Sequence, residues 1–239
     1  MKKLLVTIAV LSLPLFAFSA DTLTFGNATN GATCAPCSSI SFALDVGASS
    51  SRFLAESVKT AGDEIISVEY AGVSSTLIDE QSSTGGLGGY LTFYGHLAPT
   101  TGSNNVVMTA NGSVSFMAGT ASAYWNVDQN FPTIKAKGVC DSTNACNASG
   151  TTVTDGSWIV AGFGNQVGSC TAGTGTNLRG DNGAFAACIG DSGIVTVAGT
   201  DNVNMTIAAG GNWAWVNIVL KPSGVVAAST FCITPGICL

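Results

Sequence analysis

Apolar and polar residues alternate along most of this chain with a period of two. The alternation recurs in segments such as 39–46, 53–59, 90–96 and 212–221, which turn-forming Gly, Asn, Ser and Asp residues separate. Short alternating segments of this kind are typical of antiparallel strands that bury one face. The sequence therefore predicts an all-β fold, a two-sheet antiparallel sandwich of jelly-roll or immunoglobulin-like type with disulfide-stapled loops. The same pattern would also suit a closed barrel.

Two regions interrupt the alternation. Residues 140–156 and 168–193 are rich in Gly, Asn, Ser and Thr, and each contains a pair of cysteines. We predict that both are long loops, a feature that is usually functional or a surface elaboration in a compact domain. No change of composition requires a domain boundary between them.

The first 20 residues have the order of a secretory signal peptide. Lys2 and Lys3 precede an apolar run from 4 to 18, and small residues follow up to Ala20. The run of about 15 residues is shorter than the roughly 20 needed to span a bilayer, and Pro14 interrupts it. We expect cleavage near Ala20, a single exported domain at 21–239 and no transmembrane anchor after cleavage. The predicted location is extracellular, at the cell surface or periplasmic, and the alternative is a retained N-terminal anchor.

The composition fits an exported β protein. Charged residues make up only 9% of the chain, which has 30 Gly and a net charge of −6. Removal of the two signal lysines would leave six basic against 14 acidic residues, a net charge of −8. A negative chain without a basic cluster repels phosphate backbones, so nucleic acid is excluded as the expected partner.

Eight cysteines behind an export signal predict four disulfides. Neighbours in sequence suggest local pairs, and the predicted set is Cys34–Cys37, Cys140–Cys146, Cys170–Cys188 and Cys232–Cys238. Local bridges would staple single loops. The CxxC at Cys34 has no helical context for a redox-active site, so we interpret it as a structural staple.

One predicted strand offers a candidate ligand face. Tyr90, Tyr94 and His96 share one side of segment 90–96, while Leu91 and Phe93 take the other. An aromatic and polar face of this kind could stack a sugar, and the alternative is ordinary cross-strand packing on a solvated sheet.

Other chemical motifs are weaker. The string 188–193 resembles the nucleophile loop of chymotrypsin-like proteases, with Ser192 as nucleophile, but His96 is the only histidine and has no matching context. Asp181, Asn182 and Asp191 lie in one Gly-rich region and could bind Ca²⁺ through oxygen, although EF-hand spacing is absent. We expect no catalytic residue, no other metal and no organic cofactor.

Several segments, in order along the chain, resemble a loose family of exported bacterial and phage-borne β-sandwich surface modules. Arg52-Phe53-Leu54 resembles the family's early N-R-L-L-V strand, and segment 66–73 resembles its V-T-S-V-T-Y-G-G. Segment 91–102 resembles L-W-Y-L-x-A-P-x-x-G, segment 126–129 resembles G-V-D-Q, and segment 213–222 resembles the closing W-A…L-K-P. The resemblance implies a fold and a surface location. The family has no agreed activity, so no functional residue is carried over.

The sequence thus predicts an exported, non-enzymatic surface module that binds a glycan or a surface protein. The first alternative is a structural subunit of a cell-surface layer, filament or virion, which would self-assemble. The second is a secreted hydrolase.

Overall fold

The computed structural model describes residues 21–61, 65–83, 89–152, 154–165, 168–183, 187–224, 232–234 and 237–238. The predicted signal segment, 1–20, lies outside the described residues. All regular structure in these ranges is β-strand, so the all-β prediction is confirmed. No helix within the described ranges is long and apolar enough to cross a membrane.

The central sheet is built from five antiparallel strands in the order β1-β9-β3-β7-β6. Its members are β1 (Thr24–Cys34), β9 (Met117–Trp125), β3 (Phe53–Thr60), β7 (Tyr90–Leu97) and β6 (Thr76–Ser82). Every residue of β3 is buried. Both faces of this sheet are therefore covered.

A four-stranded sheet covers one face of the central sheet. Its order is β2-β8-β4-β5, with β2 (Cys37–Val46), β8 (Gly102–Val114), β4 (Ile65–Tyr70) and β5 (Val73–Ser74). The core between the two sheets holds apolar side chains from β2, β4 and β8 against others from β3, β7 and β9.

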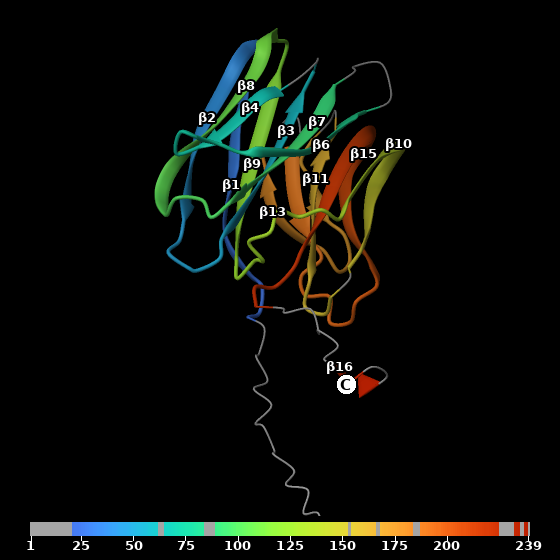
Figure 1. Ribbon diagram of the computed structural model, residues 1–239. Coiled ribbons are helices and arrows are strands. Elements are labelled where there is room, and N and C mark those ends of the chain that lie inside the picture. The colour runs from blue at the N-terminus through green and yellow to red at the C-terminus, as the bar shows by residue number, and fades with distance from the viewer. Residues whose placement is uncertain are drawn as a thin grey trace, which may run out of the picture.

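A six-stranded sheet covers the other face, so the body has the three layers that Figure 1 shows. Its path is β10-β15-β11-β14-β13, with β12 paired to β15. The strands are β10 (Lys135–Thr151), β15 (Thr200–Leu220), β11 (Trp158–Gly164), β14 (Ala187–Asp191), β13 (Asn177–Asp181) and β12 (Thr171–Ala172). A second core, which includes Phe93 and Val216, fills the space between this sheet and the central one.

The predicted number of sheets is wrong. Besides the three sheets of the body, β16 (Cys232–Thr234) and β17 (Ile237–Cys238) form a small hairpin of their own. The alternation predicts strands with one buried and one solvated face. The central sheet is instead buried on both faces, which small residues such as those of β9 allow. Gly162 shows how close the layers lie, because a Cβ there would come within 2.7 Å of the Phe93 ring.

The prediction of a long loop is wrong for 140–156, and for 168–193 it holds only between short strands. Most of 140–156 belongs to β10, which pairs with β15 over the whole of its length apart from two irregularities between Cys140 and Ala145. Region 168–193 contains β12, β13 and β14. Beyond the irregularities, the paired segments 145–151 of β10 and 200–206 of β15 pack against the far face of the six-stranded sheet, where Cys146, Val203 and other residues are buried. The abundant Ser, Thr and Asn of β10 simply occupy its exposed side.

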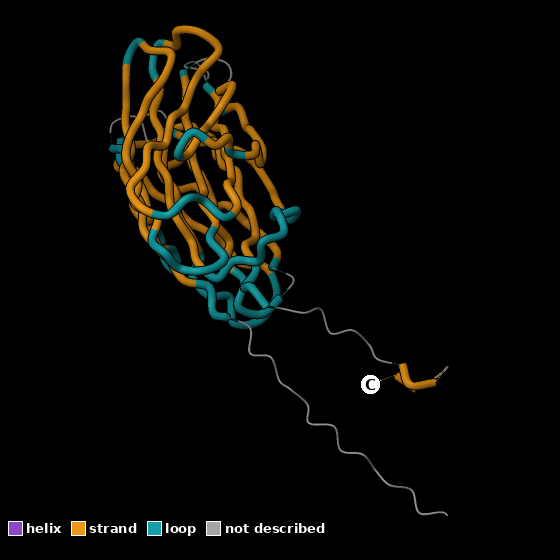
Figure 2. The backbone as a smooth tube through the Cα atoms, turned by 60° about the vertical axis from the view of Figure 1, so that its left-hand side comes forward, coloured by secondary structure: helices purple, strands orange, loops and turns teal. Residues whose placement is uncertain are grey.

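The two ends of the body lie together. The Asp21 amide donates to the Ser223 carbonyl at 3.2 Å, and the Ser223 hydroxyl donates to the Asp21 carboxylate at 3.2 Å. Many of the described loops gather at this same end (Figure 2).

Candidate functional site

The predicted ligand face on β7 is not an open surface. Leu91 and Phe93 are buried in the second core as expected. On the opposite side, however, Tyr94 is only 5% exposed and its hydroxyl donates to the Ile65 carbonyl at 3.2 Å. The prediction of a solvated aromatic face is wrong here, because the four-stranded sheet covers it; Tyr90 and His96 are half-buried.

A fully buried carboxyl group lies beside this face. Glu56 of β3 is paired in register with Tyr94, and neither of its carboxyl oxygens makes a hydrogen bond of good geometry within the described residues. Burial raises the pKa of Glu56 to about 8, while the nearby Ser75 hydroxyl lowers it by less. Glu56 is therefore mainly neutral at pH 7.

Ser75 also contacts the single histidine. Its hydroxyl lies 3.3 Å from Nδ1 of His96, and burial lowers the pKa of His96. A Ser–His pair acts in acyl transfer when a carboxylate orients the second imidazole nitrogen. Here the carboxyl of Glu56 approaches Ser75 instead, and it is neutral. The cluster does not have the geometry of a catalytic triad.

Ser192 has a structural role in the protease-like string. Its hydroxyl accepts from the Ile159 amide at 3.0 Å and donates to the Gly193 carbonyl at 3.0 Å. Ser192 belongs to the six-stranded sheet region, whereas His96 lies on the side of the central sheet that faces the four-stranded sheet. The structure does not bring the two residues together.

The adjacent Asp191 is the centre of a buried polar network. Its carboxylate accepts from Arg179 at 2.5 and 3.2 Å and from the Asn177 side chain (Nδ2) at 2.9 Å. The Tyr124 hydroxyl of the central sheet donates to it at 3.3 Å, and the guanidinium lies 4.1 Å from the Phe25 ring centre. Burial, followed by the charge of Asp191, raises the pKa of Tyr124 well above its usual value. This network joins two layers.

The predicted calcium ligands are not brought together. Asp181 and Asp191 lie at opposite ends of the β13–β14 pair, where they face Cys188 and Asn177 in register. Asp191 is already engaged by Arg179. The Asn182 side-chain nitrogen donates to main-chain carbonyls of the central sheet at 2.9 and 3.3 Å. The set does not offer a convergent group of oxygens.

Three of the predicted disulfides are present. They are Cys34–Cys37, Cys140–Cys146 and Cys170–Cys188. Cys232 and Cys238 face each other in the β16–β17 hairpin, but their side chains lie outside what the structure describes. Such bridges point to an oxidising compartment.

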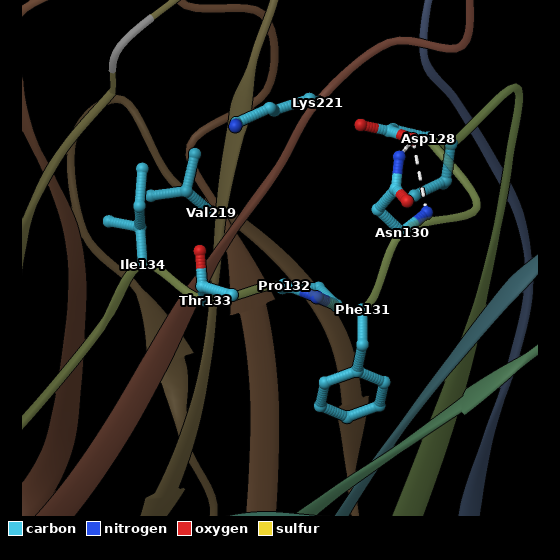
Figure 3. A pocket seen from close by; sticks show the side chains of 9 residues that line it. Asp128, Asn130, Phe131, Pro132, Thr133, Ile134, Val219 and Lys221 are labelled. Carbon is cyan, nitrogen blue, oxygen red and sulfur yellow. Dashed lines mark hydrogen bonds between the residues drawn. The ribbon is translucent and has the colours of Figure 1, made fainter.

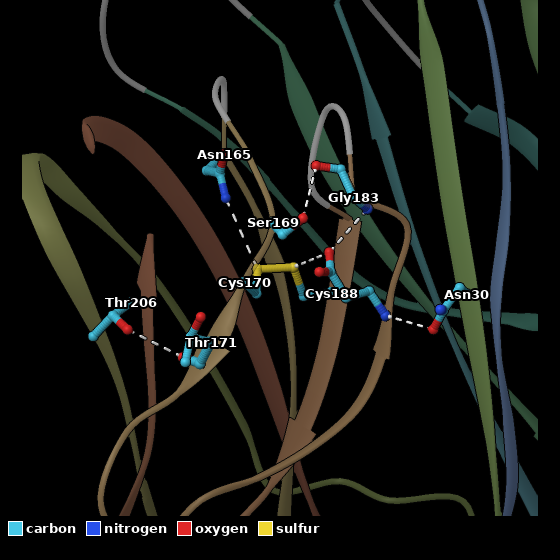
Figure 4. Close-up of a disulfide and its surroundings, with 9 residues drawn as sticks. Asn30, Asn165, Ser169, Cys170, Thr171, Gly183, Cys188 and Thr206 are labelled. Atoms are coloured by element: carbon cyan, nitrogen blue, oxygen red, sulfur yellow. Dashed lines mark hydrogen bonds between the residues drawn. A yellow bond between two sulfur atoms is a disulfide. The ribbon is translucent and has the colours of Figure 1, made fainter. Parts of the chain in front are cut away.

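The Cys170–Cys188 bridge has polar surroundings (Figure 4). Asp181 Oδ1 lies 3.5 Å from Cys188 Sγ, and the two sulfurs and the Asp181 carboxylate lie within 4.8 Å of one another. The sulfurs are bonded to each other rather than present as thiolates, which are the metal-binding form of cysteine. The arrangement is a structural staple.

A surface hollow lies where the chain passes from the central to the six-stranded sheet. We call it the loop pocket; it has a volume of about 100 Å³ (Figure 3). It is lined by Val127, Asp128, Asn130, Phe131, Pro132, Thr133, Ile134, Val219 and Lys221.

Backbone pairing at two points explains why the loop pocket exists. The Asp128 amide donates to the Lys221 carbonyl at 2.8 Å, and the Val219 amide donates to the Ile134 carbonyl at 3.0 Å. Between these points the loop leaves the end of β15. Pro132 has no amide hydrogen with which to continue a ladder. The gap between the loop and the strand end is the pocket.

Two charged groups line the loop pocket without meeting each other. Oδ1 of Asp128 accepts from the amide and side chain of Asn130 at 3.0 and 2.8 Å, whereas Oδ2 accepts no hydrogen bond from the described residues. The Lys221 ammonium likewise makes neither an ion pair nor a hydrogen bond within the described ranges.

The Phe131 ring points away from the other lining side chains and packs toward Phe53 (Figure 3).

A second hollow, of about 230 Å³, is lined by Ile134, Lys135, Ala136, Ser149, Gly150, Thr151, Thr200 and Asn217. Its main polar groups already have partners. The Asn217 side chain donates to the Ser149 carbonyl at 2.7 Å and accepts from the Ala136 amide at 3.0 Å, and Lys135 pairs with Asp79 at 3.0 Å. Of these two hollows, the loop pocket is therefore the better candidate site.

Sequence reasoning missed the loop pocket. Asp128 followed by Asn130 is an Asx-turn signal, and Lys221 lies in the closing strand motif, but both segments were interpreted as structural. Their proximity depends on the bridge between Val127 and Pro222, which are far apart in the chain.

Comparisons with protein-family models, curated proteins and solved structures found no match. The inference of function therefore depends on the residues themselves.

Proposed function

We propose that this chain is an exported, non-enzymatic surface module that binds a glycan or a protein partner through the loop pocket. The observation that carries the proposal is that Asp128 and Lys221 line one hollow, while Oδ2 of Asp128 and the Lys221 ammonium have no hydrogen-bond or ion-pair partner among the described residues. Groups of this kind can each form a charge-assisted hydrogen bond with a ligand. The resemblance to exported bacterial and phage-borne modules, and the sandwich type that it implies, remain predictions.

The size of the loop pocket favours recognition of one group of a larger ligand. Pockets that enclose a complete small molecule have volumes of roughly 300–1,000 Å³, and this hollow has about 100 Å³. A terminal sugar residue or a protruding side chain would enter only in part. Such contacts bind weakly, with dissociation constants of roughly millimolar to micromolar, and multiple copies on a surface would add avidity.

The test is a glycan array and a pull-down from the producing cell's surroundings, followed by Lys221→Met on any hit. We expect at least a tenfold loss of affinity with unchanged circular dichroism. Lys137→Met is a matched control, because Lys137 is an exposed lysine outside the pocket that pairs with Asp79 at 2.8 Å. Equal binding by the native chain and Lys221→Met would remove the loop pocket as the binding site.

A structural subunit is the second candidate. Val73 and Leu77 are 51% and 48% exposed, and they lie on β5 and β6, strands at the ends of their sheet paths. Apolar side chains on unpaired edges favour association between chains. Light scattering over a concentration series tests this role: growth in mass that Leu77→Lys suppresses would support it, and a constant monomer mass would count against it.

A further inference from the structure

The loop pocket combines three kinds of contact in one small volume. Asp128 Oδ2 is an acceptor without a donor, and Lys221 is a donor without an acceptor, within the described residues. Val219 and Ile134 supply apolar surface, and Figure 3 shows them on the side of the Lys221 ammonium, with Asp128 and Asn130 on the other side. A complementary ligand group therefore has an N–H or O–H, a carbonyl or hydroxyl oxygen, and a small apolar end.

We propose that the loop pocket binds the acetamido group of an N-acetylated amino sugar, an inference that rests on the proposed binding function. The acetamido N–H donates to the Asp128 carboxylate, and its carbonyl oxygen accepts from the Lys221 ammonium. The methyl group packs against Val219 and Ile134. The group is small enough for a hollow of about 100 Å³, and the sugar ring stays outside at the rim.

Charge favours a neutral sugar over an acidic one. The chain has a net charge of −6, and Asp128 is itself part of the site. An anionic ligand would be repelled at long range and would place a negative group near the carboxylate. Exposed Asn130 and Thr133 on the rim can bond sugar hydroxyls next to the acetamido group.

The experiment compares the trimer of N-acetylglucosamine (N,N′,N″-triacetylchitotriose, here chitotriose) with cellotriose by isothermal titration calorimetry on the purified chain. The two trisaccharides are both neutral and differ in the acetamido groups that chitotriose carries in place of hydroxyls. We expect at least tenfold tighter binding of chitotriose. Asp128→Asn replaces the free acceptor oxygen by a donor with almost no change of shape, and we expect it and Lys221→Met each to weaken chitotriose binding at least tenfold. Lys137→Met should bind as the native chain does.

The outcomes separate this inference from the proposed function. Equal affinity for both trisaccharides, or chitotriose binding that is unaffected by the two pocket variants, overturns the acetamido assignment. If an array identifies another glycan or protein whose binding does need Lys221, the proposed function stands and this inference falls. If no glycan or protein binds, both fall. The last ligand tested is a peptide with N-acetyl-lysine, which carries the same acetamido group. If the peptide binds more tightly than chitotriose, the proposal that the acetamido group belongs to a sugar is wrong.

Discussion

Asp191 is bonded to a cationic side chain and Asp128 lines the same pocket as one, and the structure uses the two carboxylates in different ways. Asp191 is fully buried and bonded to Arg179, Asn177 and Tyr124, so its charge holds the central and six-stranded sheets together. Asp128 lines a surface hollow with Lys221, and the two do not pair. Charged groups that bond to each other stabilise the fold, whereas Oδ2 of Asp128 and the Lys221 ammonium, which have no partner among the described residues, are available to a ligand.

Glu56 is a third arrangement, a buried carboxyl with no cationic partner within the described residues. The protein keeps it neutral instead, and its pKa rises to about 8. The three carboxyl groups therefore give separate predictions. The expected change in the free energy of unfolding is several kcal/mol at Glu56 and at the Asp191 pair, and almost none at Asp128.

The largest expected effect is the pH dependence that Glu56 causes. Its pKa is raised in the folded state from 4.5 to about 8, so between these values the folded chain holds a proton that the unfolded chain has lost. Stability then falls as pH rises from 4.5 to 8, by up to about 5 kcal/mol at 1.36 kcal/mol per unit. Urea denaturation across this range measures the slope.

Glu56→Gln should remove that slope and stabilise the chain at pH 8. Glu80→Gln is the matched control, because Glu80 is exposed. A native chain that is as stable at pH 8 as at pH 4.5, with no difference from Glu56→Gln, would contradict the neutral buried carboxyl.

The second-largest expected effect is the loss of stability when Arg179, the cation of the buried Arg179–Asp191 pair, is removed. Arg179→Met leaves Asp191 charged and buried without its main partner, and loss of one member of a buried pair costs about 3–5 kcal/mol. Thermal or urea unfolding measures the loss. The double variant Arg179→Met/Asp191→Asn should recover part of it, because the uncompensated charge is gone. A loss below about 1 kcal/mol in the single variant would show that the network does not join the layers.

Lys59 should cause a smaller pH dependence of stability, with a sign opposite to that caused by Glu56. It is 1% exposed, and its ammonium donates to the Thr60 carbonyl at 3.2 Å and contacts the Ser83 hydroxyl at 3.5 Å. Burial lowers its pKa from 10.5 to about 8. The folded chain then loses this proton before the unfolded chain does, so stability rises between pH 8 and 10.5, by up to about 3 kcal/mol. Lys59→Met should flatten this rise, and an unchanged slope would refute the assignment.

The smallest expected effect on stability is at the loop pocket. Asp128→Asn keeps an oxygen for Asn130, and Lys221 has no side-chain partner in the described ranges, so each variant should stay within about 0.5 kcal/mol of the native chain. Differential scanning calorimetry checks this. A loss of 2 kcal/mol or more would show that these charges serve the fold instead of a ligand.

The sequence predicted the local structure better than the arrangement of layers. Strand β7 and the buried side chains Leu91 and Phe93 follow from alternation, and three disulfides follow from cysteine spacing. Alternation cannot say what covers the second face of a strand, so the burial of Tyr94 was not foreseen. Sequence alone does not indicate the loop pocket, because Asp128 and Lys221 come to line it only through backbone pairing between segments far apart in the chain.

The most direct test of the account is an amide chemical-shift map of the isotope-labelled chain titrated with chitotriose. We expect the shifts to concentrate at residues 127–134 and 219–221, and Lys221→Met to abolish them. Shifts centred on residues 90–96 instead, or no shift at a concentration of several millimolar, would contradict the assignment of the loop pocket as an acetamido-binding site.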